Sequence, residues 1–446
     1  MKGYKNGKES FLFVLSIILL FIGTNGFWIV KSVPLTIPLF VMCFVAGVCI
    51  PLYSNSKFSA FKFAVCNYGT KLLKIFIITT LASLVHHIVL CFFYITDEWQ
   101  IVLISVAVVY ILEAIVFWIG MLCVCFTSIQ LGIETRFWAA ILGMTPILNV
   151  ILLFRIIRIT SREVDTEWNK MVVNEARKDQ QVCATRYPIL MVHGVFFRDS
   201  KRFNYWGRVP AELERNGATI YYGEHQSASS IEDSAKELAE RIKFIIEQTG
   251  CEKLNIIAHS KGGLDCRLAI FKYGLDPYIA SFTTINTPHR GCNFSDYLLN
   301  KMADNVKNTI ANGYNATLKR LGDTNPDFIA AVSDLSSDRC KVFNEMVPMP
   351  VGVYCQSTGS NLRHAVSGKF PLNFSFHLVK HFDGPNDGLV GKDSFEWGEK
   401  FMYLTNDGIR GISHGDMIDL NRQDIPGFDV REFYVELVSD LKNRGF

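Results

Sequence analysis

The residues most able to perform chemistry surround Ser260, in the segment AHSKGG (residues 258–263). The apolar run Leu254–Ile257 precedes this segment and a helical pattern follows it. The pattern G-x-S-x-G marks a nucleophile elbow, in which a strand turns sharply into a helix and leaves the serine hydroxyl exposed on a strained tip. Ala258 replaces the first glycine of the pattern, and Gly262 keeps the second. The spacing predicts an activated serine, with a plain strand-to-helix turn as the alternative.

A nucleophilic serine needs a base that accepts its proton and a carboxylate that orients the base. His414 is the only histidine after residue 381, and hydrolases with such an elbow carry their residues in the order serine, acid, histidine. His414 is therefore the predicted base. Asp387 is the predicted acid because residues 389–390 return its Gly-containing turn to apolar surroundings, and Asp383 is its competitor.

Two backbone N–H groups are expected to stabilise the oxyanion, one after the serine and one from an early strand-end loop. Lys261 supplies the first, and Val195, which follows the strand candidate 189–192, is predicted to supply the second. His193 and His259 each adjoin a strand end, where structural packing is expected rather than direct catalysis.

Short apolar runs alternate with amphipathic ones after residue 187, which predicts a mostly parallel sheet flanked by helices. Helices are expected over 209–215, over 231–245 after a Ser230 cap, and near 430–442. The strand candidates are residues 189–192, 218–222, 254–257, 281–285, 352–355, 377–382 and 401–404. Residues 187–446 thus predict one α/β domain of about 260 residues that buries its own core.

The first 157 residues predict an all-α transmembrane bundle, because they hold most of the long apolar runs. Four runs have the length and composition of spanning helices: residues 11–30, 34–53, 73–95 and 101–127. A fifth run, 137–154, is shorter and contains Pro146, so a span, a re-entrant segment and an interfacial helix all stay open. A charged helical linker is expected over residues 158–186.

The distribution of basic residues does not decide on which side of the membrane the soluble half lies. Lysines in the second loop favour a cytoplasmic amino terminus, while the arginines at 155–162 also favour the inside. Glu113, His86 and His87 lie within the spans, where ionisable groups either pair helices or mark a functional site.

Five segments together resemble the bacterial triacylglycerol lipases and esterases of the α/β-hydrolase superfamily: residues 188–195, 205–208 (YWGR), 258–263, 286–291 (NTPHRG) and 386–390 (NDGLV). The resemblance covers roughly residues 186–446. It implies an α/β-hydrolase fold, hydrolysis of carboxylic esters through an acyl-enzyme, and a lid over residues 292–350. It implies no required cofactor, although Asp416 occupies the position of a structural calcium ligand in several members.

The aromatic residues in and after the oxyanion loop either line an acyl pocket or belong to the core: Phe196, Phe197, Tyr205 and Trp206. Tethering to a bilayer favours a lipid ester substrate. The alternatives are an acyltransferase or thioesterase of the same fold, and a transporter or sensor that uses Glu113 and His86. The net charge of +3 and the lack of a basic stripe with interleaved aromatics give no case for nucleic acid.

Overall fold

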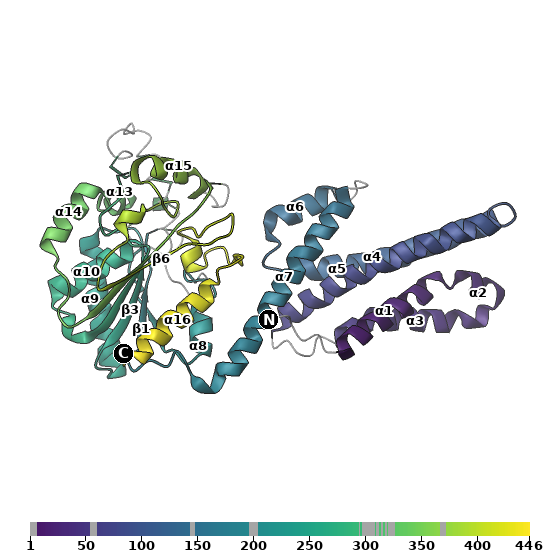
Figure 1. Cartoon of the computed structure of the whole chain (residues 1–446), viewed down its shortest axis with the longest axis horizontal. Helices are drawn as coiled ribbons and strands as arrows, with labels where there is room; N and C mark the ends of the chain where they lie inside the picture. Colours follow the sequence, from purple (N-terminus) through teal and green to yellow (C-terminus); the bar gives the residue numbers. More distant parts are fainter. Residues whose placement is uncertain are drawn as a thin grey trace. The chain divides into compact units, whose positions relative to one another are not determined.

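The chain forms two compact units, residues Met1–Glu175 and Ala176–Phe446, in a computed structural model (Figure 1). The structure describes residues 7–53, 60–142, 148–195, 204–293, 295–296, 308, 312–313, 315–316, 319, 326–365 and 372–446.

The first unit is helical. Its elements are α1 (Gly7–Asn25), α2 (Phe27–Ser32), η1 (Pro34–Thr36), α3 (Ile37–Tyr53), α4 (Phe61–Tyr94), α5 (Trp99–Thr127), α6 (Gly132–Leu142) and α7 (Leu148–Arg177). Four segments are long and apolar enough to cross a membrane: Gly7–Asn25, Pro34–Tyr53, Phe61–Tyr94 and Trp99–Thr127. The predicted fifth run, 137–154, is divided between α6 and α7, and Pro146 lies outside the described residues.

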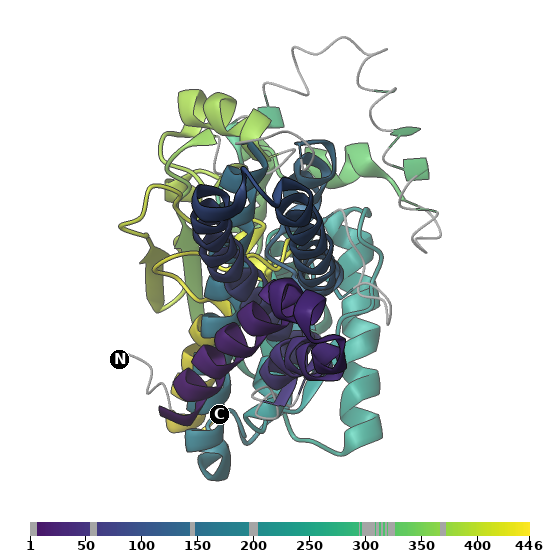
Figure 2. The same ribbon diagram turned by 90° about the vertical axis from the view of Figure 1, so that its right-hand side faces the viewer.

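Helices α4 and α5 pack closely along their length, beside the pair formed by α1 and α3 (Figure 2). Glycines permit this approach, since a Cβ on Gly69 would lie 2.6 Å from Cys123 Cβ and one on Gly120 would lie 2.9 Å from the Leu73 side chain. Two polar contacts join the same helices. Glu113 accepts a hydrogen bond from Thr79 at 3.0 Å, and His87 lies 3.0 Å from the hydroxyl of Ser105.

The second unit contains a six-stranded, all-parallel sheet with the order β2-β1-β3-β4-β5-β6 among the described residues. Its strands are β1 (Ile189–Val192), β2 (Ile220–Tyr222), β3 (Leu254–His259), β4 (Ile279–Ile285), β5 (Tyr354–Ser360) and β6 (Lys400–Leu404). Its main helices are α8 (Val209–Arg215), α9 (Ile231–Thr249), α10 (Lys261–Tyr273), α13 (Phe328–Ser333), α14 (Ser337–Met346), α15 (Leu372–Asp383) and α16 (Val430–Asn443).

Two apolar cores lie on opposite faces of this sheet because successive strand side chains point to opposite sides. Leu190 and Ile256 pack with α9, α10 and α14, whereas Met191 and Ile257 pack with α8 and α16 (Figure 1). The α/β-hydrolase architecture predicted from the sequence is therefore present.

One strand prediction is wrong. Residues 377–382 lie within helix α15. Their aromatic and apolar side chains suggest a strand, but the buried residues Phe376 and Val379 are three apart, which is a helical spacing. The chain therefore reaches the Asp387 turn from a helix.

Candidate functional site

Ser260 occupies the turn between β3 and α10 with φ 56° and ψ −132°. A positive φ is uncommon for a residue with a Cβ and stores strain that the surroundings must hold. Glycines make room for this backbone. A Cβ on Gly194 would lie 2.8 Å from Ser260 Cβ, and one on Gly262 would lie 2.4 Å from the His193 carbonyl oxygen. The local backbone thus has the form of a nucleophile elbow.

The structure brings His414 and Asp387 together. His414 Nδ1 lies 2.6 Å from Asp387 Oδ2, and the His414 backbone N–H donates to the Asp387 carbonyl at 2.9 Å. In the tautomer in which Nδ1–H donates to the carboxylate, Nε2 carries no proton and is the acceptor. The second oxygen of Asp387 accepts the N–H groups of Leu389 and Val390 at 2.9 and 2.8 Å. The competing Asp383 instead accepts a hydrogen bond from Asn293 at 2.8 Å.

Asn286 is a site residue to which the sequence alone gave no role. Its Nδ2 donates to Asp387 Oδ2 at 2.6 Å and to Ser360 Oγ at 2.7 Å. Asn286 directly follows β4 with φ 49°, a conformation that asparagine tolerates better than most residues. Its neighbour Thr287 donates to the Ser260 carbonyl at 2.8 Å. The segment after β4 therefore supports both the acid and the elbow.

The predicted oxyanion donors flank the same region. The Gly194 N–H is already used, since it donates to the Tyr205 hydroxyl at 3.0 Å. Within the described residues, neither the Val195 N–H nor the Lys261 N–H donates a hydrogen bond to another group of the chain. Both N–H groups therefore remain available for the oxyanion role that the sequence predicts.

His259, the residue before Ser260, contacts both Tyr205 and His414. Its Nδ1 lies 2.7 Å from the Tyr205 hydroxyl, and its ring centroid is 4.5 Å from that of His414. Burial, together with the nearby His414, lowers the pKa of His259 well below its usual value. His259 is therefore a neutral packing group. Trp206 is buried in the core against Tyr434, while Phe196 and Phe197 lie outside the described residues.

The surroundings of Asp416 do not fit calcium. One carboxylate oxygen accepts two hydrogen bonds from Ser413, and the other accepts one from the Arg410 guanidinium at 2.8 Å. A calcium site requires several free oxygen ligands. The described part of the chain also holds no group of three or more metal-ligating side chains. Asp416 instead fixes the loop that carries His414.

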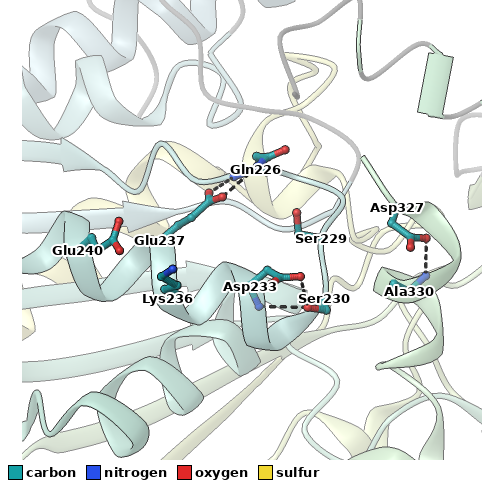
Figure 3. Close-up of a pocket in the computed structure, with 9 residues that line it drawn as sticks. All are labelled: Gln226, Ser229, Ser230, Asp233, Lys236, Glu237, Glu240, Asp327 and Ala330. Atoms are coloured by element: carbon teal, nitrogen blue, oxygen red, sulfur yellow. Dashed lines mark hydrogen bonds between the residues drawn. The ribbon is translucent and has the colours of Figure 1, made fainter. Parts of the chain in front are cut away.

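A pocket of about 400 Å³ lies at the start of α9 (Figure 3). It is lined by Gln226, Ser229, Ser230, Asp233, Lys236, Glu237, Glu240, Asp327 and Ala330. Four of these side chains are acidic and one is basic. An acyl chain requires an apolar lining, so this pocket is not suited to hold one.

A strained serine turn on a parallel sheet and a hydrogen-bonded histidine–carboxylate pair are both features of the α/β-hydrolase fold. No family model matches the chain. It is 29% identical over 178 residues to a triacylglycerol lipase of Pseudarthrobacter phenanthrenivorans, a match that covers 37% of this chain and 55% of that protein. It is 26% identical over 322 residues to triacylglycerol lipase 2 of Saccharomyces cerevisiae, covering 68% of this chain and 90% of that protein.

A solved structure, the mature lipase BlEst2 of Bacillus licheniformis, aligns with a TM-score of 0.43 and 20% identity over 57% of this chain and 92% of that one. The chain spans about half the length (55%) of the first lipase above. The chain is therefore similar to triacylglycerol lipases that share its α/β-hydrolase fold.

Proposed function

We propose that this protein is a membrane-anchored serine hydrolase that cleaves the carboxylic esters of lipids, with Ser260 as nucleophile, His414 as base and Asp387 as the orienting acid. The 2.6 Å contact between His414 and Asp387, beside a serine held at positive φ, is the observation that carries the proposal. The triacylglycerol lipases among the relatives support an acylglycerol or another lipid ester as the substrate.

In the proposed acylation step, His414 Nε2 takes the hydroxyl proton as Ser260 Oγ attacks the ester carbonyl carbon. The negative oxygen of the tetrahedral intermediate accepts the N–H groups of Val195 and Lys261. His414 then gives its proton to the alcohol oxygen, the carbon–oxygen bond breaks, and the acyl group stays on Ser260. Asp387 stabilises the imidazolium that forms in both transfers.

In the deacylation step, His414 takes a proton from water, and the resulting hydroxide attacks the acyl-enzyme. The second tetrahedral intermediate uses the same two N–H groups. Its collapse returns the proton to Ser260 Oγ and releases the fatty acid. No metal or cofactor takes part in these steps.

The apolar helices support the proposed membrane anchoring. Four segments with the length of membrane spans would hold the hydrolase close to lipid esters. We assign residues 1–157 to the transmembrane region, 158–186 to the linker, and 187–446 to the hydrolase domain with a lid over 292–350. Helices α13 and α14 fall within the residues of this proposed lid.

A fluorophosphonate probe tests the proposal directly. Protein solubilised in detergent is labelled and digested, and the adduct is mapped, with Ser260→Ala as the control. Labelling confined to Ser260, together with release of fatty acid from an acylglycerol, is the expected result. Folded protein that takes no label and releases no fatty acid would contradict it.

A further inference from the structure

The side chain of Lys261 is buried directly beneath the elbow. It is 1% exposed, and its Nζ donates to Asp265 Oδ1 at 2.6 Å and to Ser234 Oγ at 3.1 Å. Asp265 lies one helical turn further along α10 and is also 1% exposed. Because a buried ion pair is on average no more stabilising than apolar side chains of similar volume, its presence here suggests a role other than stability.

Further contacts lead from Asp265 to the loop that carries Val195. Asp265 Oδ2 lies 3.8 Å from His225 Nε2. The ring of His225 stacks on that of His193, with centroids 4.0 Å apart and planes 9° apart. His193 Nδ1 lies 2.9 Å from the Gly194 carbonyl oxygen. His193 and Gly194 directly precede Val195, so the contacts run from one predicted oxyanion donor to the other.

We infer that Lys261, Asp265, His225 and His193, here called the buried network, position the two backbone donors of the oxyanion hole relative to each other. This inference rests on the proposed function. The two donors follow different strands, β1 and β3, and each is effective only when it lies about 2.7–3.1 Å from the developing oxyanion. The buried network connects the loops after β1 and β2 to the first turn of α10, and so holds that spacing. The side chains are positioning residues and do not touch the substrate.

The test removes the charges of Lys261 and Asp265 together, so that neither is left buried without a partner. Lys261→Met alone leaves Asp265 buried without its partner, which is expected to destabilise the fold. The double variant Lys261→Met/Asp265→Leu removes both charges at similar volume and is expected to fold. Lys236→Met makes the same exchange on an exposed face of α9 (Figure 3) and serves as the matched control.

Full-length protein in detergent is assayed with a short-chain ester, and the active sites are counted by fluorophosphonate titration. For the double variant we expect kcat per active site to fall about 10- to 100-fold, somewhat less than the loss of a whole oxyanion donor, with KM within about threefold. Affinity for an alkylboronic acid, which forms a tetrahedral adduct on the serine, should fall by a similar factor. Lys236→Met should stay within about twofold of the wild type in all three measurements.

A merely structural role predicts fewer active sites with normal kcat per site, and that result would overturn the inference. A folded double variant with the kcat and boronate affinity of the wild type would also overturn the inference. Failure of the proposed function looks different, because the wild-type protein itself would then take no label at Ser260 and hydrolyse no ester, and the inference would fall with it.

Discussion

Removing the Asn286 side chain should slow the proposed reaction without affecting substrate binding. Asn286→Gly is the suitable change, because glycine keeps the backbone at φ 49° without strain. The variant loses the 2.6 Å hydrogen bond to Asp387 Oδ2. A hydrogen bond to a charged group contributes about 1.5–3 kcal/mol, which corresponds to about 10- to 150-fold in rate. Asp387 keeps the donors from His414, Leu389 and Val390, so the lower part of that range, about 10- to 30-fold, is expected.

The assay is ester hydrolysis by full-length protein, with kcat referred to active sites counted with the fluorophosphonate probe. KM should change by less than about threefold, since Asn286 contacts the acid rather than the substrate site. Ser360→Ala is the control, because it removes only the second partner of Asn286 and leaves the bond to Asp387. Asn286→Gly with kcat within twofold of the wild type would refute the assignment of Asn286 as the residue that orients the acid.

Three further outcomes follow from the hydrolase unit. Gly194→Ala places a methyl 2.8 Å from Ser260 Cβ, so thermal denaturation should show a loss of about 1–3 kcal/mol and probe labelling should fall. Arg208→Met leaves the buried Asp419 without its 2.8 Å partner and should cost about 3–5 kcal/mol by denaturant titration. Burial, reinforced by neighbouring arginines, lowers the pKa of His289 far below its unfolded value. Below about pH 6.5 the unfolded chain therefore binds a proton that the folded chain does not, and stability falls by up to about 1.4 kcal/mol per pH unit. His289→Asn should reduce the slope of stability against pH by the contribution of one proton. An unchanged slope would contradict the argument.

The sequence predicted the elements that carry chemistry better than the contacts between them. The elbow is visible because its small residues and the change from apolar run to helical spacing are local features. Ala258 fits there since its methyl is fully buried in the core beside β1. The role of Asn286 was not visible, because it depends on which loops meet at the sheet edge, and one sequence does not show this. The match of Asp416 to a calcium-ligand position rested on the resemblance at that one residue, and its hydrogen bond with Arg410 could not be predicted from spacing.

The error at residues 377–382 shows what fixes the position of the acid. The Asp387 turn was expected to follow a strand over residues 377–382, but it follows helix α15. It is nevertheless held at the sheet edge, because Leu362 N–H, two residues beyond β5, donates to the Asn386 carbonyl at 2.8 Å. Strand β5 pairs with β4, and β4 leads into Asn286, which contacts Asp387. The carboxyl ends of parallel strands meet at one edge of a sheet, so a loop tied to that edge reaches the same site whether a strand or a helix precedes it.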